Sequence, residues 1–163
     1  MTIPVTKEDQ DTLLSMLQYL KNSQDPILAK KYKLRPGSGL SANQIGLDKR
    51  MFAVLFNDHE QTQEMMLINP KIMSHSLNMT YLPEGEGCLS VNRPVHGFVP
   101  RYERIKVKAY DIHGQEFIIS LTGYGAIVVQ HEMDHLNGIM FYDRINKENP
   151  FKLPENVIIE SLY

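Results

Sequence analysis

Residues 131–135 (HEMDH) constrain this chain more than any other segment, because they place two histidines four residues apart. On an α-helix these positions lie one turn apart on the same face, so both imidazoles can bind one metal ion. The preceding run, 126–130, is apolar enough to bury such a helix. Buried histidines need polar partners, and a metal ion is a suitable one. The segment therefore predicts a buried, metal-binding helix.

Glu132 directly follows the first of these histidines. From that position on the helix, its carboxylate lies close enough to the metal to take a proton from a metal-bound water. Two ligands and a general base in one turn of helix indicate a metallohydrolase.

The third protein ligand is not obvious from this segment. A metzincin would place a histidine where this chain has Phe141, and no histidine follows residue 135. A thermolysin-like site would use a downstream glutamate, for which Glu155 and Glu160 are candidates. Pro154 interrupts the approach to the first, and residues 157–159 are typical of a strand. A zinc endopeptidase is thus disfavoured but remains the alternative.

Cys88 is the only cysteine of the chain and therefore cannot form an internal disulfide. A small buried apolar role is the ordinary interpretation of such a residue. Here, however, Gly85 and Gly87 flank Glu86 just before it, and glycines let backbone approach a ligand closely. A Cys-His-His set with an open fourth position suits a catalytic divalent transition metal.

Three separated segments read GSGLSANQ at 37–44, EGCLS at 86–90 and HEMDH at 131–135. Together they resemble the motifs of peptide deformylase. The resemblance covers roughly residues 34 to 163. A long segment after the cysteine and a strand-like C-terminus resemble the type II enzymes of Gram-positive bacteria. The resemblance implies an α+β, deformylase-like fold in which a central metal-binding helix packs against antiparallel β-sheets, with residues 1–163 as a single catalytic domain.

The resemblance also implies the chemistry. The enzyme would remove the formyl group from N-formylmethionyl peptides and nascent chains and release formate, with Cys88, His131 and His135 as metal ligands. Iron(II) would be the physiological metal, and zinc, nickel or cobalt could occupy the site. Ribosome contact stays open.

Further site residues follow from the same resemblance. The Gln44 side-chain amide and the Leu89 backbone N–H would stabilise the oxyanion, with Glu132 as general base. The substrate backbone would pair near Gly39 and Gly87. The methionine pocket would be lined by Tyr124, Ile127 and Val128, although helix core is an equal interpretation for Ile127. Asp134 is expected to pair with Arg101.

The sequence departs from the family pattern at two places. Ser41 stands where the family usually has alanine, and we expect a modest effect if its hydroxyl finds a partner. Members also commonly carry a G-x-P-x-L-R segment ahead of the first long helix, whereas this chain begins near that helix. We therefore expect lower stability of the sheet that the segment would join. This departure supports a third hypothesis, a non-catalytic relative that binds formylated peptides.

Composition indicates a soluble enzyme. The 163 residues are 42% hydrophobic, enough for one core, and the net charge of −2 leaves no basic footprint for nucleic acid. No apolar run approaches a membrane span and the N-terminus lacks the apolar core of a signal peptide, so a cytoplasmic location is expected.

The hydrophobic spacing predicts a helix over 6–22 capped by Thr6, a short helical piece over 24–33, and the metal-binding helix from Gly123 to a C-cap at Asn137-Gly138. Strands are predicted at 51–56, 65–69, 72–76, 105–111 and 116–121, the last two as a hairpin around His113-Gly114.

Overall fold

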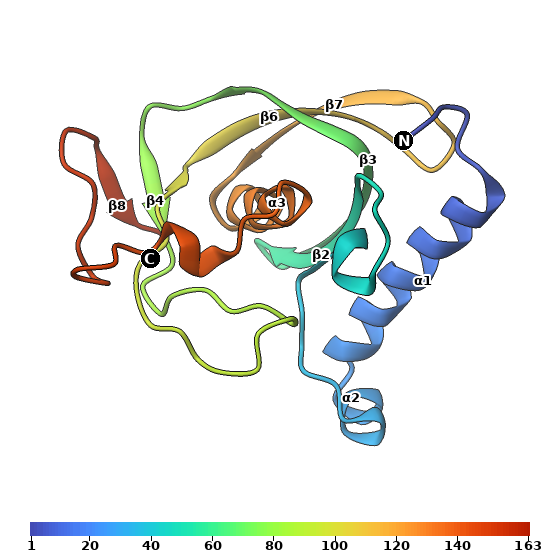
Figure 1. The fold of residues 1–163 in the computed structure, drawn as a ribbon, viewed down its shortest axis with the longest axis horizontal. Helices are drawn as coiled ribbons and strands as arrows, with labels where there is room; N and C mark the ends of the chain where they lie inside the picture. The colour runs from blue at the N-terminus through green and yellow to red at the C-terminus, as the bar shows by residue number, and fades with distance from the viewer.

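A computed structural model describes residues 1–163. One helix, α3 (Gly123–Leu136), lies in the hollow of a curved five-stranded sheet (Figure 1). The strands follow the order β1-β2-β3-β6-β7 and every neighbouring pair is antiparallel. Their bounds are β1 Gly39–Ser41, β2 Met51–Asp58, β3 Gln61–His75, β6 Arg104–Tyr110 and β7 Glu116–Thr122. The expected α+β architecture around a central helix is confirmed.

Strand β2 is covered on both faces because its side chains alternate between two cores. Phe52, Val54 and Phe56 belong to the cluster that includes α3 residues such as Val129. The intervening residues Met51, Ala53 and Leu55 belong to a second cluster with α1. This double burial explains why the strand is an almost continuous apolar run.

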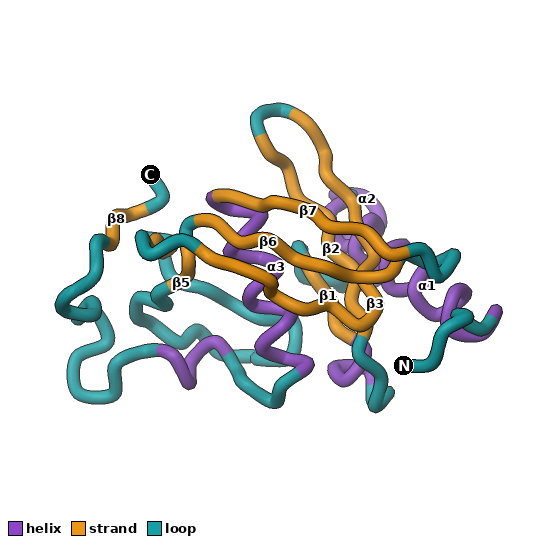
Figure 2. The backbone as a smooth tube through the Cα atoms, turned by 90° about the horizontal axis from the view of Figure 1, so that it is seen from above, coloured by secondary structure: helices purple, strands orange, loops and turns teal.

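The outer face of the sheet is covered by α1 (Lys7–Gln24). Thr6 caps it, with Oγ1 accepting a hydrogen bond from the Asp9 N–H at 3.1 Å, as the sequence predicts. Asp25 caps the short α2 (Pro26–Tyr32), which buries no residue. Both helices lie at the end of the molecule opposite to the C-terminus (Figures 1 and 2). None of the helices combines the length and apolar character needed to span a lipid bilayer.

A small second sheet closes the other end, in the order β5-β4-β8. It consists of β4 (Met79–Tyr81), β5 (Arg101–Tyr102) and β8 (Ile159–Ser161). The β4–β8 pair is parallel, and residues 82–100 between β4 and β5 contain no helix or strand. Two 3₁₀ turns complete the fold, η1 (Ala42–Ile45) and η2 (Phe141–Arg144).

One strand prediction is wrong in a way that has a clear cause. The sequence predicts a break between strands at 65–69 and 72–76, but β3 runs unbroken from Gln61 to His75. Asn69 adopts a left-handed φ of 50° and Pro70 has no N–H to donate, and the register with β6 shifts between Ile68 and Lys71. The irregularity bends the strand without ending it.

Candidate metal centre and catalytic cavity

The two histidines of α3 converge as their spacing predicts. His131 Nε2 lies 3.2 Å from His135 Nε2, and His135 is buried. Helix α3 ends at Leu136, with Asn137 as its C-cap and Gly138 following at a φ of 76°, which confirms the predicted C-cap. The helix thus presents both rings on one face, one turn apart.

Cys88 reaches the same point from the loop 82–100. Its Sγ lies 3.2 Å from His135 Nε2, and one donor atom from each of Cys88, His131 and His135 lies within 4.8 Å of the others. The three donor atoms, one sulfur and two nitrogens, converge at one point. This donor set fits a divalent transition metal with at least one position left for another ligand.

Buried charges hold the histidine and the loop together. Glu86 Oε1 accepts a hydrogen bond from His131 Nδ1 at 2.9 Å and from Arg101 Nη2 at 2.8 Å. Arg101 also donates to Asp134 Oδ2 at 2.5 Å, which confirms the predicted pair. Asp134 in turn accepts from Arg144. Because Nδ1 of His131 is occupied by Glu86, its Nε2 is the nitrogen left for a metal.

These contacts set the protonation of the site. Burial would raise the pKa of Glu86, but Arg101 and His131 hold it at about 2. Burial opposes the rise in the pKa of His131, yet Cys88 and Glu86 bring it to about 10. Burial likewise opposes the fall in the pKa of Cys88, which hydrogen bonds from both histidines lower to about 5. The cysteine is therefore a thiolate at neutral pH, the form that binds metals.

Glu132 occupies the floor of the site and is 2% exposed. Burial raises its pKa against the opposing charges of His131 and His135. Its Oε2 is buried without a hydrogen-bond partner, an arrangement that is rare unless the atom serves a function. A Cβ added at Gly39 would lie 2.5 Å from its Oε1, so β1 packs directly against this carboxylate.

Gln44 faces the cysteine from η1. Its Nε2 donates to Ser90 Oγ at 2.8 Å and lies 3.4 Å from Cys88 Sγ. Leu89 is held nearby, since Arg35 Nη2 donates to its carbonyl at 2.7 Å and its side chain fills the space beside Gly37. Both candidate oxyanion donors therefore border the metal centre.

A cavity of about 470 Å³ opens onto the metal centre. It brings together Gly39, Gly87 and the three candidate pocket residues Tyr124, Ile127 and Val128. Ile127 and Val128 are also buried, so for them pocket lining and helix core are compatible. The cavity is lined by Arg35, Pro36, Gly37, Ser38, Gly39, Leu82, Glu84, Gly85, Glu86, Gly87, Cys88, Leu89, Tyr124, Ile127, Val128, His131, Glu132 and Tyr163.

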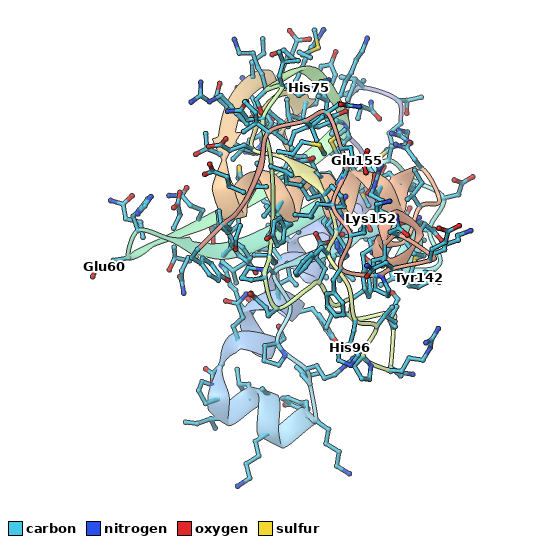
Figure 3. The ribbon with its side chains drawn as sticks, turned by 90° about the vertical axis from the view of Figure 1, so that its left-hand side faces the viewer. Glu60, His75, His96, Tyr142, Lys152 and Glu155 are labelled. Atoms are coloured by element: carbon cyan, nitrogen blue, oxygen red, sulfur yellow. The ribbon has the colours of Figure 1, made fainter.

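The glutamates required for an endopeptidase site lie elsewhere. The Glu155 side chain is 80% exposed and faces Lys152 at 4.0 Å on the surface (Figure 3). Glu160 is exposed on β8 and belongs to no cluster of metal-binding side chains. The structure thus favours Cys88 as the third ligand.

Sequence reasoning missed two residues that shape the site. The sequence indicates Glu86 only as a residue between two glycines, although its carboxylate orients His131. Arg35 was not singled out, although its guanidinium donates to the Leu89 and Val91 carbonyls. For Glu86, an acidic residue two positions before a candidate ligand was the available signal; for Arg35 the sequence offers none.

Comparison with known proteins agrees with this geometry. The family model for polypeptide deformylase matches residues 1–151. The chain belongs to the polypeptide deformylase family. It is 54% identical over 155 residues to the peptide deformylase of Oceanobacillus iheyensis, covering 94% of this chain and 85% of that one. It is 58% identical over 154 residues to peptide deformylase 2 of Bacillus anthracis, covering 94% and 84%. The expected resemblance to type II deformylases of Gram-positive bacteria is confirmed.

Solved deformylase structures show the same fold. That from Thermus thermophilus superimposes with a TM-score of 0.68 at 33% identity, covering 85% of this chain and 73% of that one. That from Ehrlichia chaffeensis gives 0.73 at 28% identity, covering 90% and 79%. Members of the polypeptide deformylase family are metal-dependent hydrolases that remove the formyl group from the N-terminus of newly made polypeptides, and this is the activity of the chain.

Proposed function

We propose that Cys88, His131 and His135 hold the metal ion of this deformylase and that Glu132 moves the protons of the reaction. The observation that carries the proposal is the convergence of the three donor atoms, all within 4.8 Å, beside a buried carboxylate oxygen that has no partner. When bound, the ion supplies Lewis-acid chemistry and lowers the pKa of a water ligand. The thiolate and imidazole donors are compatible with iron(II), which we propose as the physiological metal, and with zinc, nickel or cobalt.

Glu132 acts as base and then as acid. It takes a proton from the attacking water, whose oxygen bonds to the formyl carbon, and it returns the proton to the amine nitrogen as the C–N bond breaks. The products are formate and a free peptide N-terminus. The raised pKa of this carboxyl supports the role, because a carboxylate with a higher pKa is a stronger base toward water.

Gln44 and Leu89 stabilise the negative charge that develops on the formyl oxygen. Nε2 of Gln44 already points toward Cys88 Sγ, and the Leu89 backbone lies next to the same ligand in the loop. Donors fixed in place before the reaction cost no reorganisation when the charge appears.

The substrate binds as an added strand. Strand β1 is an edge strand, paired only with β2, so the unpaired side of Gly39 can bond the backbone of an extended peptide. No atom lies within 4 Å of a Cβ built on Gly87 across the cavity, which leaves space for that peptide. Tyr124, Ile127 and Val128 then surround the methionine side chain.

Backbone pairing tolerates many sequences, which suits an enzyme whose partners are formylmethionyl nascent chains. We therefore propose action in the cytoplasm, where such chains are made; contact with the ribosome stays a hypothesis. We also propose that residues 1–163 form one catalytic domain, because β2 contributes to both main core clusters.

Formate release from a formyl-methionyl tripeptide tests the assignment. Protein reconstituted anaerobically with iron(II) should turn over, and Glu132→Ala should lose activity by about 10²–10⁴-fold while it retains one metal per chain. Cys88→Ser should fail to retain the metal. Absence of turnover in folded, metal-loaded wild type would instead support the non-catalytic, peptide-binding hypothesis.

A further inference from the structure

Ser41 occupies a special place on β1. Side chains of a strand alternate between faces, so Gly39 and Ser41 share a face while Leu40 points the other way. Leu40 packs in the core cluster with α1, and Gly39 abuts Glu132. Ser41 therefore faces the catalytic side of the strand, where its side chain is fully buried.

The hydroxyl of Ser41 contacts Gln44. Oε1 of Gln44 accepts two hydrogen bonds from this one residue, from the Ser41 N–H at 2.8 Å and from Oγ at 2.8 Å. The amide nitrogen consequently faces the opposite way, toward Ser90 and Cys88. If the amide turned over, its NH₂ group would face the Ser41 N–H, and two donors would oppose each other.

A fully buried hydroxyl that bonds the side chain of the proposed oxyanion donor does more than fill space. Alanine, the residue that the family usually has here, would leave only the backbone N–H to orient the amide.

We propose that Ser41 is a positioning residue for the deformylation reaction, whose hydroxyl holds the Gln44 amide with Nε2 directed at the formyl oxygen of the substrate. The inference rests on the proposed role of Gln44. It goes beyond that role because it assigns the orientation of the donor to a side chain that touches neither metal nor substrate.

If the contact only stabilised the turn, removing the hydroxyl would lower the stability of the fold. Ser41 precedes η1, and the bond from its N–H to Gln44 already closes the turn. This backbone bond remains when the hydroxyl is removed, and an alanine occupies less space in the same site. Ser41→Ala should therefore fold and bind metal like wild type, and any loss should concern turnover.

The kinetic test is a double-mutant cycle on zinc- or iron-loaded enzyme with a formyl-methionyl tripeptide. Losing one buried hydrogen bond to the donor should lower kcat about three- to tenfold, with KM nearly unchanged. In a Gln44→Leu background, Ser41→Ala should have no further effect on kcat. An equal loss in both backgrounds would overturn the inference. Full activity of Gln44→Leu would instead refute the proposed role of Gln44 itself.

An independent readout is the side-chain amide of Gln44 in ¹⁵N-glutamine-labelled, zinc-loaded protein, assigned by its absence in Gln44→Leu. We expect its two protons to be well separated and slow to exchange in wild type, and to exchange faster in Ser41→Ala. Ser23→Ala is the matched control, because it also removes a fully buried hydroxyl, one that donates to Leu20 O, accepts from the Gly37 N–H and does not touch Gln44. Unchanged amide signals in Ser41→Ala, or an equal change in Ser23→Ala, would exclude positioning through this hydroxyl.

Discussion

Glu86 accepts a hydrogen bond from Nδ1 of His131 at 2.9 Å, although the two residues are 45 positions apart in the chain. The carboxylate is almost fully buried, its side chain 4% exposed. It joins the loop that carries Cys88 to the helix that carries His131, and it orients the imidazole of this proposed ligand. A partner of this kind fixes the tautomer of the ligating ring and raises its basicity.

Replacing this carboxylate should weaken metal binding. Glu86→Gln keeps the shape but removes the charge that holds the His131 proton on Nδ1, so the affinity for zinc should fall by about 10–100-fold. Competition against a chromophoric chelator measures the affinity. Glu84→Gln is the matched control, because Glu84 carries the same charge two residues away and bonds instead to the Tyr163 hydroxyl. Equal affinity of both variants would contradict the assigned role of Glu86.

Replacing Arg101, which is buried beside Glu86, should strongly lower the free energy of unfolding. The Arg101 side chain is 2% exposed and pairs with both Glu86 and Asp134, so Arg101→Leu removes the buried cation that these two carboxylates share. We expect a loss of about 3–5 kcal/mol, which lowers Tm by about 10 °C for a domain of this size. Thermal unfolding of metal-free protein measures the change without a contribution from bound metal.

Arg144 provides the comparison, since it bonds the same Asp134 but its side chain is 41% exposed. Arg144→Ala should cost at most about 1 kcal/mol, because water screens an exposed pair. Similar losses for the two arginine variants would show that burial does not govern these pairs.

The convergence of His131 and His135 was predictable from the sequence because both residues lie in one short helical segment. The spacing of His131 and His135 needs only helical periodicity, and the apolar run before them predicts burial. Cys88 could be placed with them only because three motifs together resembled one family. The structure adds the distance, 3.2 Å from Cys88 Sγ to His135 Nε2, that periodicity alone could not give.

The supporting residues were less predictable because their contacts join distant segments. Arg35 bonds carbonyls in the loop more than 50 residues away, and nothing in its neighbourhood indicates this. Short strands such as β4 and β5 carry too few residues to show a period of two. The gap between the predicted strands at 65–69 and 72–76 contains Pro70, which cannot donate to a sheet, but the chain accommodates it at a shift in the register with β6.

Adding one methyl group beside the base should impair catalysis. In Gly39→Ala, the new Cβ would lie 2.5 Å from Glu132 Oε1 and 2.7 Å from its Cγ, so the carboxylate must move. Displacement of a catalytic group by about 1 Å can cost about 100-fold, and we expect a fall in kcat of about ten- to 100-fold. Gly87→Ala meets no atom within 4 Å and should affect only KM. Steady-state kinetics separate the two, and an unchanged kcat in Gly39→Ala would refute close packing against the base.

Removing the metal should uncover a reactive thiolate. Cys88 is half-buried, which raises its pKa, but hydrogen bonds with His131 and His135 lower that pKa to about 5. Because only the thiolate is a nucleophile, the rate of alkylation by iodoacetamide in chelator-treated protein should be high at pH 7 and fall as the pH drops through about 5. The chain has one cysteine, so all label reports on this site. His135→Asn should move the midpoint upward, and zinc should protect against labelling. A wild-type midpoint near 9, the ordinary value for a thiol, would show that the histidines do not stabilise the thiolate.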